Sequence, residues 1–222
     1  MNELNHKVLV TFSDNYGHVS EIADNMSRKL IDLGLTVDTI DLERTKQKRW
    51  PTINDFNGVI LISGQNKMWT FWNKKAKKFV TFYVSPFEGK NKVIGFFRSD
   101  PWAYQGISDP VKAKEKFGKN ILKSFNFIPD FYDDFGPVLD FSRKSKLKHD
   151  DRSSLKGIAK EIGKKTGLEF EYKGFNDFRD WNRIEEICDE FAEKLQKGNS
   201  CSSCGNIIQK GIEFCTNCGN KM

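Results

Sequence analysis

The sequence has no run of apolar residues that approaches the roughly 20 needed for a membrane-spanning helix. Its first residues, MNELNHKVLV, lack the layout of a secretory signal peptide. From these two absences we expect a soluble, cytoplasmic protein. Cysteine is also scarce over most of the chain, because four of the five Cys lie in the last 22 residues and Cys188 stands alone. Without an export signal, such a group indicates a metal site rather than a disulfide framework.

The sequence also lacks the residue patterns of several kinds of reaction centre. His6, His18 and His149 show no metal-ligand spacing, and there is neither a nucleophile motif nor a pair of carboxylates spaced for acid–base catalysis. The sequence therefore names no catalytic residue. The 36 Lys and Arg outnumber the 30 Asp and Glu, but they are spread along the chain, so we expect no specific nucleic-acid partner.

The length and composition of the chain support one folded domain and a small C-terminal module. The chain has 222 residues, 38% of them hydrophobic, including 19 Phe, which is enough for one domain of ordinary size. The short Gly198-Asn199-Ser200 stretch is the expected linker. We therefore divide the chain into a domain of residues 1–197 and a C-terminal module of residues 198–222.

Short apolar strands alternate with amphipathic helices along the first domain. Strands are predicted at 7–12, 36–42, 58–63, 92–97, 136–141 and 168–172. A polar, basic stretch lies between the last two of these strands and ends at about residue 167. Helices are predicted after residue 20, after Trp72, after Asp109-Pro110 and from about 177 to 197. This alternation predicts an α/β fold with a parallel sheet and helices on both faces.

The loop between the first strand and first helix is a candidate phosphate site. Its backbone N–H groups and the positive end of the helix dipole favour an anion. Ser13, Asn15 and Ser20 add side-chain donors, and Gly17 permits a close backbone approach. The loop is neither a dinucleotide fingerprint nor a P-loop. An ordinary polar turn that caps the helix is the alternative.

Three stretches, LVTFSDNYGHVSEIA, GLTVDTIDL and FNGVILISGQNKMW, resemble a flavodoxin-like domain, and more closely the subfamily that includes the quinone-dependent protoporphyrinogen oxidase of bacteria. The resemblance covers about residues 6–196 and continues to FNDFRDWNRIEEICDEFAEKL. It implies a doubly wound, three-layer, five-stranded parallel sheet that binds FMN in three loops. Carried over, the FMN-binding residues are Ser13, Asp14, Asn15, Tyr16, Gly17, His18, Val19, Ser20, Gly64, Gln65, Asn66, Trp69, Arg98, Ser99, Trp102 and Tyr104.

The resemblance implies an FMN-binding redox protein, acting in electron transfer or as a flavin-dependent oxidoreductase. Trp69, Trp102 and Tyr104 are aromatic residues suited to stack on a flavin ring. The family carries hydroxyl donors where Tyr16 and Val19 stand, and this favours an alternative, a flavin-free interaction module. Protoporphyrinogen-oxidising members are rich in aromatic and apolar residues where this chain is polar and basic, so that activity is not carried over.

The basic run of Arg143, Lys144, Lys146 and Lys148 lies in that polar stretch. Such a run is most often a solvated surface, and a contact with an anionic partner or a membrane surface is its alternative function. The protein partner itself, whether a redox partner or a docking partner, is not identified by the sequence.

The tail, CSSCGNIIQKGIEFCTNCGNKM, holds two C-x-x-C-G knuckles separated by ten residues, and it resembles the short zinc ribbons of prokaryotic proteins. Cys201, Cys204, Cys215 and Cys218 provide four sulfurs for a closed tetrahedral zinc site. A segment this short builds no core, so the metal would supply its folding energy. The same ligands also suit iron, and a flavin beside an Fe(Cys)4 centre would form an electron relay.

Overall fold

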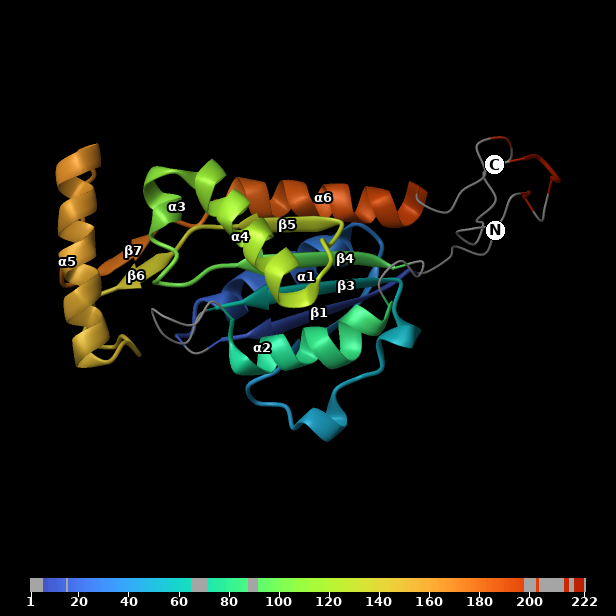
Figure 1. The fold of residues 1–222 in the computed structure, drawn as a ribbon, viewed down its shortest axis with the longest axis horizontal. Coiled ribbons are helices and arrows are strands. Elements are labelled where there is room, and N and C mark those ends of the chain that lie inside the picture. The colour runs from blue at the N-terminus through green and yellow to red at the C-terminus, as the bar shows by residue number, and fades with distance from the viewer. Residues whose placement is uncertain are drawn as a thin grey trace.

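Five strands form one parallel sheet at the centre of the protein (Figure 1). The computed structural model describes residues 6–14, 16–64, 72–87, 92–197, 203, 214–215 and 218–221. The strands are β1 (Lys7–Ser13), β2 (Thr36–Asp41), β3 (Gly58–Ser63), β4 (Val93–Arg98) and β5 (Phe131–Asp134), in the spatial order β2-β1-β3-β4-β5. This is the flavodoxin-like order of doubly wound α/β folds, which confirms the predicted fold class.

Helices cover both faces of the sheet, as Figure 1 shows. Alternate residues of β1 point to opposite faces, so Val8 and Val10 pack with α1 (Val19–Asp32) and α6 (Trp181–Lys197). Leu9 lies in the other core, with α2 (Lys74–Phe79) and α4 (Pro110–Phe125). Because both faces are buried, the central strands are continuous apolar runs rather than alternating ones.

One close contact explains the glycine at the start of β3. A Cβ added at Gly58 would lie 2.8 Å from the ring of Phe191 on α6, closer than carbon atoms approach one another. The missing side chain therefore lets α6 pack directly on the sheet. Phe191 is completely buried there.

The ends of two predicted helices are confirmed in detail. Asp109 caps α4, because its side chain accepts a hydrogen bond from the N–H of Lys112, and Pro110 is the first residue of the helix. After α1, Gly34 has a φ of +83°, a conformation that favours glycine. α2 is followed directly by a π-helical turn (Val80–Val84) and a 3-10 turn (Ser85–Phe87).

The segment between β5 and α6 differs from the sequence prediction. The fifth parallel strand is β5, not residues 136–141. Within 136–141, β6 (Val138–Asp140) instead pairs antiparallel with β7 (Phe175–Asp177) in a separate sheet. The predicted strand at 168–172 is irregular, and the basic stretch forms α5 (His149–Thr166). The last helix begins at Trp181 rather than 177.

This β6–α5–β7 unit lies beyond the carboxyl ends of the parallel strands (Figure 1). It has its own apolar cluster, to which α5 contributes Leu155, Ala159 and Ile162. Tyr16, from the loop after β1, and Trp102, from the loop after β4, pack in the same cluster. The unit thus covers part of the sheet edge where doubly wound folds bind ligands. Among the described helices, none is long and apolar enough to cross a membrane.

Candidate functional site

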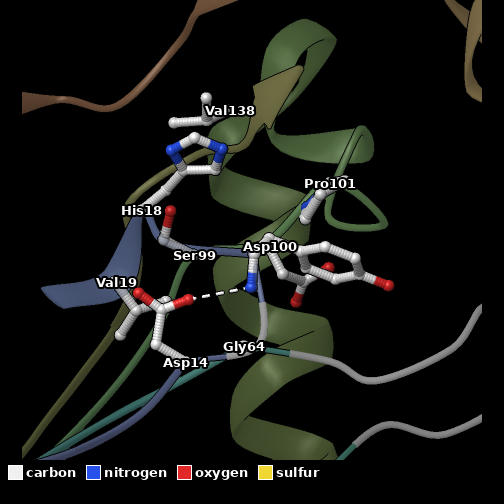
Figure 2. Close-up of a pocket in the computed structure, with 9 residues that line it drawn as sticks. Asp14, His18, Val19, Gly64, Ser99, Asp100, Pro101 and Val138 are labelled. Carbon is white, nitrogen blue, oxygen red and sulfur yellow. Dashed lines mark hydrogen bonds between the residues drawn. The ribbon is translucent and has the colours of Figure 1, made fainter. Parts of the chain in front are cut away.

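Described residues that follow β1, β3 and β4 line a small pocket at the carboxyl edge of the sheet. Between its described walls the free volume is about 10 Å³, which is room for about one water molecule. The pocket is shown in Figure 2 and is lined by Asp14, Tyr16, His18, Val19, Gly64, Ser99, Asp100, Pro101 and Val138. It lies at the ends of β1 and β3, where the chain has added β2 on one side of β1 and then adds β3 on the other, so it occupies the topological switch point of the sheet.

The loop after β1 is folded around the side chain of Asp14. One carboxylate oxygen, Oδ1, accepts hydrogen bonds from the N–H groups of Tyr16 at 3.0 Å and Gly17 at 2.5 Å. The other, Oδ2, accepts from the N–H of Ser20 at 2.9 Å. Gly17 has a φ of +95°, which turns the chain so that these donors face one point. In Figure 2 the dashed line drawn to Asp14 is one of these bonds.

The bonds to Asp14 have two consequences. First, the bond from Ser20 satisfies an N–H group in the first turn of α1, which has no partner within the helix; the N-cap residue, His18, makes no side-chain cap bond. Second, they show that three donors of the predicted phosphate loop converge on an anion. That anion is the protein's own carboxylate.

The remaining loop residues have structural contacts. The Ser13 hydroxyl donates to Glu43 at 2.7 Å, away from the loop donors. His18 contacts the ring of Phe175 edge-on at 5.4 Å, and burial lowers its pKa. Val19 is buried in the main core, and the Ser20 hydroxyl is 3.4 Å from the carbonyl oxygen of Gly17.

The loop after β4 begins with a buried ion pair. Arg98 donates to Asp134 of β5, and both side chains are almost completely buried. The Ser99 hydroxyl donates to the carbonyl oxygen of Gly136 at 2.7 Å. Arg98 therefore joins β4 to β5 and does not line the pocket, whereas Ser99 does.

Asp100 is the pocket residue that the sequence interpretation missed. It is 3% exposed, and its Oδ1 accepts a hydrogen bond from the N–H of Trp102 at 2.7 Å. Its other carboxylate oxygen, Oδ2, has no hydrogen-bond partner among the residues that the structure describes. Burial raises the pKa of Asp100 to about 6, although the nearby Arg98 lowers it. The signal available in the sequence was its position, two residues after an apolar strand that ends at the ligand-binding edge.

Two of the aromatic residues predicted to stack on a flavin ring, Trp102 and Tyr104, do not line the pocket. Trp102 is 7% exposed and packs in the apolar cluster of the β6–α5–β7 unit, and Tyr104 is partly buried against the same cluster. Neither lines the pocket, but Tyr16 does, and burial raises its phenol pKa. The other predicted residues of this site, Asn15, Gln65, Asn66 and Trp69, lie outside the described residues, whereas Gly64 lines the pocket.

The cysteine tail is described only in part, and Cys201 and Cys204 lie outside that part. Around the second knuckle, the N–H of Gly219 donates to the carbonyl oxygen of Cys215 at 2.8 Å, and Gly219 has a φ of +72°. The N–H of Cys215 donates to Asn220, and Phe214 pairs with Lys221 in an antiparallel bridge. No group of three or more metal-ligating side chains occurs within the described part of the chain.

No family model and no curated protein matches the chain. Among solved structures, it is similar to a flavodoxin from Streptococcus pneumonia (18% identity, TM-score 0.39, covering 72% of this chain and 99% of that one). It is also similar to an archaeal flavodoxin (13%, 0.41, 73% and 99%). A third similar structure is a flavodiiron core from Synechocystis (18%, 0.46, 87% and 36%). Similarity at this level carries no argument about function, so the fold rests on the observed strand order, which is that of a flavodoxin-like protein.

Proposed function

We propose that the protein is a redox protein that binds a flavin at the carboxyl edge of its flavodoxin-like sheet. The observation that carries this proposal is the position of the pocket at the switch point of the flavodoxin-like sheet, between residues that follow β1, β3 and β4. When bound, the flavin would supply the electron or hydride transfer. The protein would hold it and exclude water around it.

FMN is the flavin that the fold implies. Its ring end and its phosphate end would lie in different surroundings in this protein. The pocket offers two acceptors for the N–H and hydroxyl groups of a flavin: the hydroxyl oxygen of Ser99, and the Asp100 oxygen that has no hydrogen-bond partner among the described residues. The phosphate loop fits an anion in its donor geometry, but Asp14 already uses those donors. The phosphate of FMN therefore does not fit the loop as it is folded.

Absorption and fluorescence of the purified protein test this proposal. We expect added riboflavin or FMN to bind, with quenched flavin fluorescence and shifted absorption bands. A colourless protein that leaves the spectra of both flavins unchanged would contradict the proposal.

A second candidate function, a flavin-free interaction module, is favoured by the bonds of Asp14. A loop that satisfies its own donors needs no bound phosphate to be stable. In this case the C-terminal ribbon would dock a protein partner, and the purified protein would hold zinc, bind that partner and show no redox activity.

We also propose that the tail is a zinc ribbon. The hydrogen bond from Gly219 to Cys215 and the positive φ of Gly219 turn the chain back behind the second cysteine pair, which supports a metal knuckle. Cys201, Cys204, Cys215 and Cys218 would be its ligands, with iron in place of zinc as the alternative that gives an electron relay. The exposed basic residues near the start of α5 would be the contact for an anionic partner or surface.

A further inference from the structure

Two carboxylates, Asp14 and Asp100, line the pocket at the switch point from opposite loops (Figure 2). We infer that Asp14 makes the site select riboflavin, a flavin that ends in a hydroxyl group, over FMN, which ends in a phosphate, while Asp100 accepts from the donors that both flavins carry. This inference rests on the proposed flavin-binding function and defines the chemical class of flavin that the site takes.

Asp14 acts against the phosphate in two ways. Its carboxylate occupies the N–H groups of Tyr16, Gly17 and Ser20, so a phosphate finds these donors already used. It also places a negative charge where the phosphate would bring another, and like charges placed together are strongly unfavourable in a partly buried site. A neutral hydroxyl group is not repelled, and it needs none of these donors because it can itself donate a hydrogen bond to a carboxylate oxygen.

The described cations around the loop do not reverse this balance. Arg179 donates to the carbonyl oxygen of His18, but its charge is paired with Asp177 and Glu21 at 2.6 and 2.7 Å. Lys146 lies beside Gly17, where a Cβ on the glycine would be 2.9 Å from its Nζ. The single positive charge of Lys146 equals the single negative charge of Asp14, so the two together give no excess positive charge for a phosphate that carries about two negative charges.

Asp100 acts in favour of a donor. Its side chain is almost completely buried, and its Oδ2 accepts no hydrogen bond from the described residues. A buried acceptor without a donor is costly, so a ligand that supplies an O–H or N–H group gains by satisfying it. The hydroxyl groups along the ribityl chain are such donors, and since riboflavin and FMN both carry them, Asp100 favours a flavin of either kind and the selectivity rests on Asp14.

Flavin fluorescence titrations of the full-length protein test the inference. For the wild type we expect riboflavin to bind at least about tenfold more tightly than FMN. In Asp14→Asn, which keeps the shape of the side chain and removes its charge, FMN binding should strengthen by about tenfold or more while riboflavin binding changes little. Asp24→Asn on the exposed face of α1 is the matched control and should behave as the wild type. Asp100→Asn should weaken the binding of both flavins and leave the preference between them unchanged.

The outcomes separate this inference from the function on which it rests. Tighter binding of FMN than riboflavin by the wild type, or equal flavin preferences in the wild type and Asp14→Asn, would overturn the selectivity and leave the flavin proposal standing. Failure of both flavins to bind to every variant would overturn the flavin proposal itself. Circular dichroism melting curves of each variant identify any that fail to fold, and for those Asp14→Ser gives the same comparison.

Discussion

At the scale of single residues, two aspartates with similar sequence positions have opposite surroundings. Asp14 follows β1 and accepts three backbone hydrogen bonds, while Asp100 follows β4 and keeps one oxygen without a described partner. Hydrogen bonds to a carboxylate stabilise its charge, and burial without them destabilises it. The difference makes Asp14 part of the loop's structure and Asp100 the residue available to a ligand.

Asp100 makes the stability of the protein depend on pH. Burial raises its pKa to about 6, so the folded state holds the proton more tightly than the unfolded state does. The free energy of unfolding therefore falls as pH rises from about 4 to about 6, and the penalty persists above that range. We expect Asp100→Asn to gain about 1 kcal/mol more over the wild type at pH 8 than at pH 5. Urea unfolding at the two pH values measures this difference.

Asp24→Asn controls for the general loss of one negative charge, because Asp24 is exposed on α1. Its effect on the free energy of unfolding should be small at both pH values. A stability difference between Asp100→Asn and the wild type that is the same at pH 5 and pH 8 would show that Asp100 does not titrate in this range.

At the scale of elements, α4 shows how local sequence sets a helix boundary. Asp109 accepts a hydrogen bond from the N–H of Lys112 at 2.9 Å, and Asp109→Ala removes it. We expect the free energy of unfolding to fall by about 1 kcal/mol, while Asp109→Asn, which keeps a capping oxygen, stays near the wild type. Chemical denaturation of the three proteins compares them, and equal losses in both variants would rule out the cap as the cause.

The β6–α5–β7 unit is held together by an apolar cluster of its own. Leu155 of α5 is completely buried in its cluster, and the neighbouring Ser154 is exposed. Leu155→Ala should cost about 2–5 kcal/mol, because it removes buried methyl groups and leaves a cavity. Ser154→Ala should change stability little. In Leu155→Ala, amide hydrogen exchange should be accelerated, relative to the wild type, more in α5 than in β1 and β3. Equal acceleration in all three would mean that the unit and the sheet unfold together.

At the scale of the whole molecule, the parallel-sheet domain and the cysteine tail rely on different sources of stability. The described core clusters draw on residues up to Leu195, and the tail is too short to build a core of its own. We expect one equivalent of zinc per chain. Removing it with a chelator should leave the melting temperature of the sheet domain unchanged.

Cys215→Ser should lower the zinc content sharply, and Cys188→Ser, which changes a buried core cysteine, should not. Metal analysis of the two variants and the wild type provides the comparison. Iron at one equivalent would instead favour the electron relay. Full metal retention in Cys215→Ser would contradict the proposed ligand set.

The sequence by itself determined the parts of this protein whose signals are local. Apolar runs and helix caps predicted β1, β3, β4, α1 and α4. A strand buried on both faces needs consecutive apolar residues and a helix end needs a suitable capping residue, so both signals lie in residues that are neighbours in the sequence. The position of the pocket also followed, since the loops after parallel strands meet at one edge.

Only the tertiary structure decided which strand is fifth and what the phosphate loop holds. β5 carries Asp133 and Asp134, whose charges are tolerated because Arg183 and Arg98 reach them from other elements, and no local pattern reveals such partners. In the same way, the spacing of residues 13–20 predicts donors for an anion but not that Asp14 turns inward to take them. Ion pairing and burial depend on residues that are distant in the sequence, and only the folded structure brings these residues into contact.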